Sequence, residues 1–573
     1  MTAISCDVVV VGSGAGGLSA ALAAADAGLD VVVIEKDSLF GGTTAHSEGM
    51  IWIPKNRKAE AQGKSDDPVA ALTYLRAIAG NQLDEAKAAA YVERAAEALD
   101  FIEANSRIRY ALAGSLDYYS RLPGATVGTR SLRVEAMDGK TLGSLFDEIR
   151  PPLRSTLAFG GMTITAADLP SALKAHRSVQ AFLHMAKLAL GYGIDRARGY
   201  SRGTRISHGH ALVACLVEAL RTKGARLFTS TALGSLIVDN GRVTGAHADS
   251  RSGSVTIEAR RGVVLAAGGF SNGAAMQARF YPTRQSATDK ALLASPASTG
   301  DGLAAGETAG GMISSDVSQA AAWTPASLVP QADGSTIAFP HYIDRNKPGF
   351  IAVDATGRRF ANEALVYQDF VAAMIEHCRA KPATECWLIA DARAVDRYGI
   401  GAAPPFPALL GRFVKSGYLT KANSLVSLAS KIGLPADALA STVERFNAFA
   451  RAGKDPDFGR GESAYERACG DAAVSPNPSL GPLEVSPFYA VRLLPSDIGT
   501  FAGLKTDRDA RVLRADGSAI EGLYAAGNDA ASAFGGTYPA AGITVGLALT
   551  FGYLAGRHLA GNVAPRSISV PVT

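Results

Sequence analysis

Residues Cys6–Lys36, CDVVVVGSGAGGLSAALAAADAGLDVVVIEK, decide the fold of this chain. Val8–Val11 form a continuous β-branched run, which is typical of a parallel strand buried on both faces. A glycine-rich turn follows, and the small-residue stretch Gly16–Ala27 predicts a helix that packs closely on the sheet. After Gly28, Leu29–Ile34 predicts a second strand. The order strand, glycine turn, helix and strand indicates a nucleotide-binding βαβ unit.

The glycines of this unit follow the pattern GxGxxG at Gly12, Gly14 and Gly17. Gly12 permits the tight turn, Gly14 lets a pyrophosphate approach the backbone, and Gly17 lets the helix lie close to the sheet. The helix directs its unsatisfied N–H groups and positive dipole end towards that phosphate. Glu35 ends the second strand and can accept hydrogen bonds from an adenosine ribose. We therefore expect a dinucleotide site, and the glycines and Asp26 argue against a membrane helix.

A second glycine-rich turn, Gly41–Gly42–Thr43–Thr44, follows the acidic residue. Flavoproteins with an N-terminal fingerprint carry such a turn, whereas soluble NAD dehydrogenases do not need one. The sequence therefore favours FAD over NAD.

Three later segments also bring glycine-rich backbone to a predicted ligand. Gly262–Gly269 (GVVLAAGG) and Gly522–Gly527 (GLYAAG) each read as a buried strand that ends in a glycine turn. The loop Gly535–Gly542 leads into a small-residue helix, Ile543–His558, which presents its N-terminus to an anionic group. In a flavoprotein the natural occupant is the pyrimidine edge of the isoalloxazine.

Composition limits the remaining possibilities. The chain of 573 residues, with 47% apolar and 19% charged residues, is an ordinary globular protein too long for one hydrophobic core. A net charge of +4 with scattered basic residues argues against nucleic-acid binding. Five widely spaced cysteines and nine histidines without a ligand cluster argue against disulfides and a metal site, so we expect a cytoplasmic protein. The early first strand leaves no room for a signal peptide.

The segment order predicts one domain inserted into another. Residues 1–283 are expected to form the first part of a Rossmann-type FAD-binding domain, and residues 485–573 its second part. Residues 284–484, richer in proline and aromatic residues, are expected to form an inserted α+β catalytic domain. Its clearest segment, residues 349–374, predicts a strand, a hairpin turn, a returning strand and a helix, with Tyr367 at the helix start. The fold class is therefore α/β with an inserted domain.

With these segments identified, the chain resembles the 3-ketosteroid dehydrogenase branch of the fumarate-reductase-like FAD proteins, nearly from end to end. The segments that carry the resemblance are GSGAGG (12–17), GGTTAHSEGMIWIP (41–54), LAAGGF (265–270), TGDG (299–302), GRRFANEALVYQDF (357–370) and GGTYPAAGITVG (535–546). Members of this branch are similar in placing one Tyr in a DY…LPG loop, a second after ANE and a third in a YPxxG loop. This chain has all three, at Tyr118, Tyr367 and Tyr538.

The resemblance implies 1,2-dehydrogenation of a 3-oxosteroid, in which a proton leaves C2 and a hydride passes from C1 to FAD N5. Tyr367 is then the candidate base, and Tyr118 assists it. The Tyr538 hydroxyl and the Gly542 N–H are the candidate donors to the ketone oxygen, which gains negative charge as the proton leaves. Tyr119 is an alternative to Tyr118, because side chains of neighbouring residues face opposite ways.

The glycine segments and the resemblance together give the candidate residues for FAD. They are Gly12, Ser13, Gly14, Ala15, Gly16, Glu35, Lys36, Gly41, Gly42, Thr43, Thr44, Ser47, Gly49, Met50, Leu233, Ala267, Gly268, Gly527, Asn528, Ile543 and Thr544. We expect non-covalent FAD, because the histidine that carries flavin in membrane-bound relatives aligns with Thr43 and not with His46. A quinone or similar acceptor would reoxidise the enzyme.

Three alternatives stay open. A 3-oxo-5α-steroid 4-dehydrogenase would desaturate C4–C5 instead. A fumarate-type reductase would need an arginine before the last helix, where this chain has the uncharged TYPAAG (537–542). A flavin-binding scaffold without turnover would have no use for three tyrosines in an apolar cleft. The sequence leaves open the preferred steroid and the oligomeric state. A hydrophobic substrate would favour loose membrane association, but no amphipathic anchor is evident.

Overall fold

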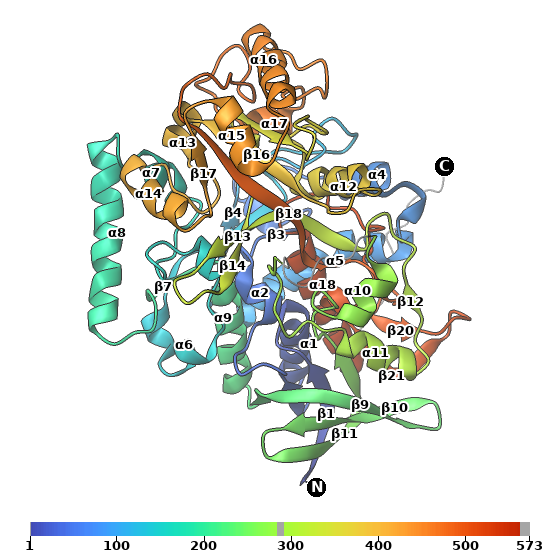
Figure 1. Ribbon diagram of the computed structural model, residues 1–573. Coiled ribbons are helices and arrows are strands. Elements are labelled where there is room, and N and C mark those ends of the chain that lie inside the picture. Colours follow the sequence, from blue (N-terminus) through green and yellow to red (C-terminus); the bar gives the residue numbers. More distant parts are fainter. Residues whose placement is uncertain (1, 283–290, 562–573) are drawn as a thin grey trace.

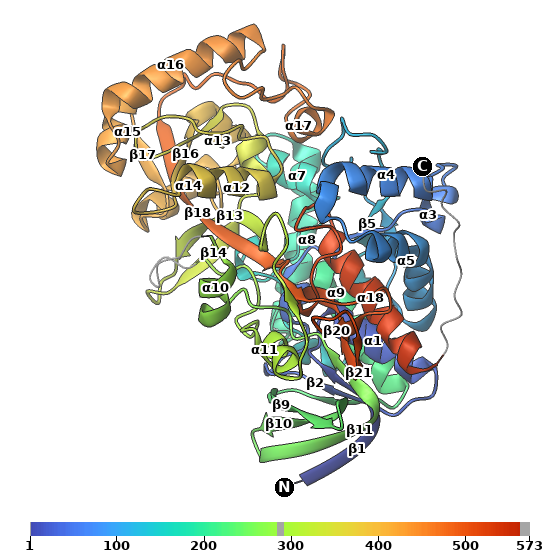
Figure 2. The ribbon, with the colours of Figure 1, turned by 90° about the vertical axis from the view of Figure 1, so that its right-hand side faces the viewer.

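The computed structural model describes residues 2–282 and 291–561, and it consists of two sheet-based halves (Figures 1 and 2). In Figure 1 the sheet around β1 and the helices α1 and α18, from the first and last parts of the chain, form the lower half, whereas α4, α7 and α8 extend up beside the upper half. The middle of the chain, yellow and orange, forms the upper half around β16 and β18. The predicted domain junction at 283/284 and the tail beyond residue 561 lie outside the described residues.

The lower half is built on a sheet of eight strands in the order β20–β21–β11–β1–β2–β8, with β10 paired to β11 and β9 paired to β10. These strands are β1 (Thr2–Val11), β2 (Val31–Ile34), β8 (Arg226–Phe228), β9 (Thr231–Asp239), β10 (Arg242–Ser250), β11 (Gly253–Leu265), β20 (Arg511–Leu513) and β21 (Ala519–Ala525). The four central pairings, from β21 to β8, are parallel. Val8, Val9 and Val10 are fully buried, which confirms the strand predicted from the β-branched run.

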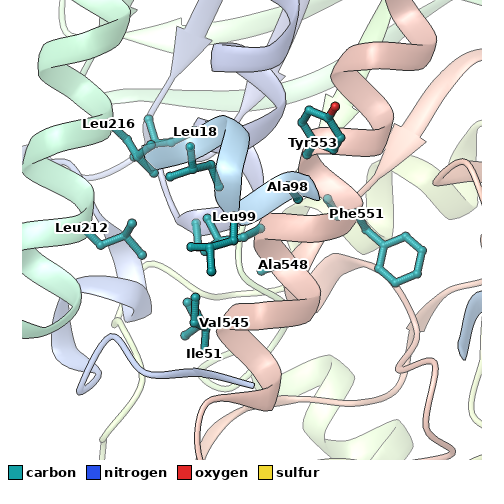
Figure 3. Packing of buried hydrophobic residues seen from close by; sticks show 14 of the residues in the cluster. Leu18, Ile51, Ala98, Leu99, Leu212, Leu216, Val545, Ala548, Phe551 and Tyr553 are labelled. Atoms are coloured by element: carbon teal, nitrogen blue, oxygen red, sulfur yellow. The ribbon is translucent and has the colours of Figure 1, made fainter. Parts of the chain in front are cut away.

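Helices α1 (Ala15–Asp26), α5 (Glu85–Asn105), α9 (His208–Thr222) and α18 (Ile543–Leu559) form one core beside this sheet (Figure 3). Figure 3 shows Leu18 of α1 between Leu212 and Leu216 of α9 on one side and α5 and α18 on the other. The small residues of the first and last helices therefore let distant parts of the chain share a single core.

Helices α1 and α18 approach each other so closely that no side chain fits between them at two points. A Cβ atom on Gly552 would lie 2.2 Å from the Gly16 carbonyl oxygen, and one on Gly556 would lie 2.3 Å from that of Ala20. The Ser19 hydroxyl donates to the Leu549 carbonyl at 2.7 Å. This contact sets the last helix of the chain directly against the first.

The upper half is built on a second sheet in the order β14–β13–β18–β16–β15, with β17 paired to β18. Its strands are β13 (Ala321–Pro330), β14 (Thr336–Pro340), β15 (Phe350–Val353), β16 (Cys386–Asp391), β17 (Thr420–Ala422) and β18 (Phe488–Thr500). The surrounding helices are α12 (Tyr367–His377), α13 (Ala392–Tyr398), α14 (Pro407–Lys415), α15 (Leu425–Ile432), α16 (Ala436–Ala452) and α17 (Ala464–Cys469). Because β18 pairs with β13, β16 and β17, the second sheet extends past the predicted boundary at residue 485.

The remaining elements connect the two halves or cover their faces. They are α2 (Gly42–His46), β3 (Ile51–Trp52), α3 (Arg57–Glu60), α4 (Pro68–Ala79), β4 (Tyr110–Leu112), β5 (Ser131–Val134), β6 (Met137–Asp138), α6 (Leu145–Glu148), α7 (Leu169–Lys174), α8 (Val179–Ala197), β7 (Arg205–Ile206), α10 (Ala274–Phe280), α11 (Asp301–Thr308), β12 (Ile313–Ser314) and β19 (Gly503–Leu504). Helix α8 stands at the outer edge of the molecule in Figure 1.

The contact between α1 and α18 gives a first prediction. Gly552→Ala should lower the thermal midpoint of unfolding, because its methyl group must push the Gly16 carbonyl away, at a cost of about 1–3 kcal/mol. Gly411→Ala is the matched control: this helical glycine of α14 has nothing within 4 Å of the added Cβ. We expect the control to be neutral or to stabilise by up to about 1 kcal/mol. Equal midpoints for the two variants in a thermal scan would contradict the prediction.

Candidate active site and flavin site

A cavity of about 1370 Å³ is lined by residues from both halves of the molecule. Small-molecule pockets usually span about 300–1,000 Å³, so this volume suits a dinucleotide together with a further ligand. All candidate cofactor residues line the cavity except Gly41 and Ile543, and the four candidate catalytic residues line it too. The chain segments singled out from the sequence therefore meet around one space.

The fingerprint turn at the end of β1 has the geometry that a phosphate requires. Gly12 has a φ of +102°, and a Cβ there would lie 2.2 Å from the Ala266 carbonyl oxygen. A Cβ on Gly17 would lie 2.0 Å from the Gly12 carbonyl oxygen. Gly14, in contrast, is open: its Cβ would meet only the Thr44 hydroxyl, at 3.4 Å. The open position lies at the start of α1 on the cavity wall, where a pyrophosphate would pass.

Glu35 holds the two glycine turns together. Its Oε2 accepts from the Ser13 N–H at 3.0 Å and from the Ser13 hydroxyl at 2.5 Å. The Ser13 hydroxyl in turn accepts from the Gly41 N–H at 2.8 Å. Gly41 is therefore used in bracing the turn, which explains why it is absent from the cavity wall. Lys36 pairs with Asp301 at 2.8 Å, a partner that the sequence did not indicate.

The opposite wall is organised by a residue that sequence reasoning missed, Asp529. Its carboxylate accepts from the Ala267 N–H at 2.6 Å and from the Gly269 N–H at 2.8 Å. Burial raises the pKa of Asp529 to about 6. The carboxylate thereby shapes the LAAGG turn, and its position directly after Gly527–Asn528 was the only local signal for it.

The start of α18 completes this wall. Gly542 has a φ of +92° and caps the helix, and a Cβ there would lie 2.4 Å from the Ile51 nitrogen. Only glycine therefore fits at this position. Thr544 lines the cavity, whereas Ile543 is fully buried beneath the helix start.

Further cavity residues come from segments that carried no strong sequence signal. Ser295 and Ser298, in the small-residue run ASPASTG, line the cavity beside the flavin-type turn, where the Ser295 N–H donates to the Thr43 hydroxyl at 2.9 Å. His46 also lines it, with Nδ1 at 3.1 Å from the Leu293 carbonyl oxygen. Burial lowers the pKa of His46 to about 4, so this ring is neutral at physiological pH.

Three tyrosines from three distant segments meet at the other end of the cavity. The rings of Tyr118 and Tyr538 are stacked with centroids 6.0 Å apart. The Tyr367 ring lies edge-on to both, at 6.0 Å from Tyr118 and 5.3 Å from Tyr538. Tyr367 is thus the ring that contacts both other tyrosines edge-on. Two tyrosines that the sequence did not reveal extend the cluster: Tyr342, at 5.1 Å from Tyr367, and Tyr465, at 5.0 Å from Tyr118.

The backbone fixes this arrangement. The Tyr118 N–H donates to the Pro539 carbonyl at 3.0 Å, which ties the Tyr118 loop to the Tyr538 loop. Tyr367 is the first residue of α12 and reaches the cluster from the upper half. The Tyr119 hydroxyl instead donates to the Asp369 carboxylate at 3.0 Å. The structure thus brings Tyr118, and not Tyr119, against Tyr367.

Burial controls the protonation of the cluster. It raises the pKa of Tyr118, Tyr367 and Tyr538 above the ordinary tyrosine value of 10.0, and neighbouring tyrosines raise the first two further. All three hydroxyls are therefore protonated at neutral pH and can donate hydrogen bonds. A phenolate formed there would be a strong base.

Within residues 2–282 and 291–561, no group of three or more His, Cys, Asp or Glu side chains could hold a metal ion. In the same ranges, no helix has the length and apolar character needed to cross a bilayer.

The profile of the FAD binding domain family matches residues 7–545. The chain belongs to this family. Its members bind FAD, and the open backbone at Gly14, the braced Glu35 and the two helix N-termini of this cavity fit that cofactor. FAD is therefore the cofactor, as the sequence predicted.

Comparison with individual relatives shows which members of this family the chain is similar to. The chain is 40% identical to a 4-oxocyclohex-2-ene-1-carboxylate 5-dehydrogenase of Sinomonas cyclohexanicum, over 97% of this chain and 94% of the relative. It is 38% identical to the 3-oxosteroid 1-dehydrogenase of Mycobacterium tuberculosis, over 99% and 100%. A crystal structure of 3-ketosteroid delta1-dehydrogenase from Sterolibacterium denitrificans, in complex with 1,4-androstadiene-3,17-dione, has a TM-score of 0.89 and 35% identity, covering 98% of this chain and 100% of that one. The predicted fold and the predicted relation to the ketosteroid dehydrogenases are confirmed.

The open position at Gly14 gives a second prediction. Gly14→Val should abolish FAD retention, because its branched methyl groups would enter the space that the pyrophosphate needs. The fold should persist, since this residue has an ordinary φ of −76° and free space around its Cβ. Flavin absorbance of the purified protein and its circular dichroism test the two parts separately. Gly14→Ala, with one methyl group, should retain more flavin. A fully loaded Val variant would contradict the assignment.

Proposed function

We propose that the protein is a 3-oxosteroid 1-dehydrogenase, which removes one hydrogen each from C1 and C2 of the steroid A ring. The observation that carries this proposal is the cluster of Tyr118, Tyr367 and Tyr538, with ring centroids 5.3–6.0 Å apart at one end of the cavity. A ketone presented there meets several hydroxyl groups in an otherwise apolar surrounding. The identity to 3-oxosteroid 1-dehydrogenases over the whole chain supports the same reaction.

In this proposal the tyrosines divide the work of removing the C2 proton. The Tyr538 hydroxyl and the Gly542 N–H donate to the 3-oxo group and stabilise the negative charge that develops on its oxygen, a contribution typically of about 3–4 kcal/mol. Tyr367 accepts the proton from C2, and Tyr118 hydrogen-bonds to Tyr367 and stabilises its phenolate. FAD, when bound, supplies the acceptor for the C1 hydride. A quinone-like acceptor then takes up the electrons.

The walls of the cavity beyond the tyrosines favour a large apolar ketone. Apolar residues of α7, α8 and α14 line it: Leu169, Leu173, Phe182, Met185, Leu409 and Phe413. The loop before α18 carries no charge, which fits a ketone better than a dicarboxylate. A fumarate-type reductase would need an arginine in this loop to hold a dicarboxylate, and this chain has none there.

One alternative has a specific observation in its favour. The relative of 40% identity is named for a cyclohexene carboxylate, a much smaller ring ketone with an acidic group. Arg154, Lys347 and Arg412 line the cavity and could hold a carboxylate. The tyrosine cluster would serve either ring, so the two functions differ in substrate and not in chemistry.

An anaerobic mixing experiment separates these functions. The oxidised yellow protein is mixed with androst-4-ene-3,17-dione, a 5α-saturated 3-oxosteroid, 4-oxocyclohex-2-ene-1-carboxylate or buffer, and the flavin colour and products are followed. Rapid bleaching with a 1,4-diene product supports the proposal. Bleaching only with the 5α-steroid moves desaturation to C4–C5, and bleaching only with the carboxylate shifts the substrate class. If none of these ketones bleaches the flavin but fumarate oxidises the pre-reduced protein, the protein is a dicarboxylate reductase instead.

The base assignment gives a third prediction. Tyr367→Phe should lower turnover by about 10²-fold or more and leave the flavin content unchanged, because only the hydroxyl at the reacting carbon is lost. Tyr119→Phe is the matched control, since that hydroxyl lies against Asp369 and outside the cluster. The control should keep turnover near that of the wild type. Steady-state rates with flavin quantification test both variants, and equal rates would rule out Tyr367 as the base.

The raised tyrosine pKa gives a fourth prediction. Because burial holds the pKa of Tyr367 above its ordinary value, only a small fraction is phenolate at pH 7. A base acts when deprotonated, so kcat/KM should rise with pH between about 7 and 9, by up to about tenfold per unit. The residual activity of Tyr367→Phe should lose this slope. A flat profile in the wild type would show that another group accepts the proton.

A cytoplasmic location is part of the proposal. The five cysteines are all free thiols, and four of them are buried, which agrees with a reducing compartment.

A further inference from the structure

Arg345 is a fully buried arginine that no carboxylate holds. It lies in the single-turn helix η4 (Asp344–Asn346), where its Nε donates to the His341 carbonyl at 3.2 Å and its Nη1 donates to the Glu363 carbonyl. In the described part of the chain, its Nη2 has no hydrogen-bond partner and no carboxylate lies within 4.0 Å of the guanidinium. A buried charge without an opposite charge is costly, so this arrangement requires an explanation.

Two other buried guanidinium groups of the upper half are paired in the ordinary way. Arg359 binds the carboxylates of Glu363 and Asp455 at 2.7 Å and 2.8 Å, and Arg460 binds that of Glu363 at 3.0 Å. These three cations share two anions, so Arg345 is the member of the group that is left with carbonyl oxygens alone.

The acids nearest to Arg345 are bound to other groups. The Asp344 carboxylate lies 2.7 Å from His341 Nδ1 and accepts from the Gly401 N–H at 2.7 Å, besides accepting from the Arg345 backbone N–H. The Asp369 carboxylate accepts from the Tyr119 hydroxyl at 3.0 Å. The other charged or titratable groups around Arg345 and the tyrosines are Arg460, Lys347, Cys469, Tyr342, Tyr465 and Glu48, the last paired with His208 at 3.1 Å.

Arg345 contacts the chain on both sides of Tyr367. The Glu363 carbonyl that it binds comes four residues before the tyrosine. The Phe370 ring, three residues after it, has its centre 5.1 Å from the guanidinium carbon. The cation is therefore fixed at the first turn of α12, where Tyr367 enters the cluster.

The cation also lies beside the tyrosine that backs Tyr118. The Tyr465 ring is 5.0 Å from that of Tyr118, and the Tyr465 N–H donates to the Ser120 hydroxyl at 3.3 Å, which ties α17 to the same loop. Burial raises the pKa of Tyr465, and the positive charge of Arg345 opposes this rise. Arg345 is thus placed to favour negative charge in the cluster.

We propose that Arg345 is the counter-ion of a tyrosinate in the cluster, and that it thereby makes Tyr367 a competent base near neutral pH. The Tyr367 proton is released to solvent, the tyrosinate balances the guanidinium charge, and the proton from C2 later restores the hydroxyl. A nearby opposite charge favours the ionised form of a group, and it adds to the effect of neighbouring hydrogen bonds. Arg345 does not line the cavity, so it is a positioning residue. The proposal rests on the proposed function, in which Tyr367 is the base.

The pH dependence of kcat/KM tests the proposal on the FAD-loaded enzyme, with a ketone that bleaches the wild-type flavin. Arg345→Gln should lower kcat/KM about tenfold or more at each pH between about 7 and 9, because the rising limb moves up by about one pH unit or more. Arg345→Lys keeps the charge and should recover most of this loss. Arg202→Gln is the matched control: Arg202 is also buried and held by two carbonyls, those of Phe146 and Ile149, and it should follow the wild type.

A double-mutant comparison separates the charge from a structural role. In the Tyr367→Phe background no tyrosinate forms at this position, so adding Arg345→Gln should change the residual kcat/KM less than about twofold. An equal loss in both backgrounds would overturn the proposal. Cys469→Asp leaves the arginine in place but sets a carboxylate near it, and it should mimic Arg345→Gln, whereas Cys469→Asn should not. This pair decides the question if Arg345→Gln does not fold.

A titration without substrate keeps the proposal separate from the proposed function. Ultraviolet difference absorbance follows tyrosinate formation in the FAD-loaded protein, and the signal missing from Tyr367→Phe belongs to Tyr367. Its midpoint should lie about one pH unit or more higher in Arg345→Gln than in the wild type. If no ketone bleaches the flavin, the proposed function fails and this titration still tests Arg345. Superimposable curves for the wild type and Arg345→Gln would overturn the role of the arginine.

Discussion

The backbone contact between α1 and α18 is the constraint on which the rest of the site depends. Gly552 lies against the Gly16 carbonyl, and the Ser19 hydroxyl reaches the Leu549 carbonyl, so the two helices cannot shift separately. Because Gly14 and Gly542 cap the N-termini of these helices, the contact also fixes the distance between the two positive helix ends on the cavity wall. The fingerprint and the loop before the last helix are thereby held as one cofactor surface, although most of the chain separates them.

The tyrosine cluster depends on the contact between α1 and α18, because Tyr538 lies in the loop before α18. It also requires that the upper half be fixed against the lower half, because Tyr367 comes from the upper half. Tyr118 and Tyr538 belong to the lower half and are tied together by the bond from the Tyr118 N–H to the Pro539 carbonyl. Tyr367 arrives from the upper half at the first turn of α12. Burial keeps all three hydroxyls protonated at rest, which makes them donors to a ketone but opposes formation of a phenolate. A base in this position works only if hydrogen bonds from its neighbours offset part of the cost of its charge.

The parts predicted from the sequence are those with a local signature. The β-branched run, the fingerprint glycines and the motifs around Tyr118, Tyr367 and Tyr538 are each encoded within a few residues. Tyr342 and Tyr465 were missed because they reach the site through contacts between distant segments, and no short pattern marks them. Asp529 directly follows Gly527–Asn528, but its role was missed because it depends on hydrogen bonds to the distant LAAGG turn. The choice between Tyr118 and Tyr119 also depends on tertiary structure and not on the local sequence. Adjacent residues point apart, and only the position of Asp369 decides which hydroxyl leaves the cluster.

Helix α8 (Val179–Ala197) carries apolar residues on two opposite sides. A stretch that is apolar on opposite sides normally predicts a fully buried helix. In this structure one side of α8 lines the cavity and the opposite side is exposed to solvent. The helix is therefore a thin wall between the cavity and the exterior. A wall of this kind must stay apolar inside to accept a steroid-like ligand.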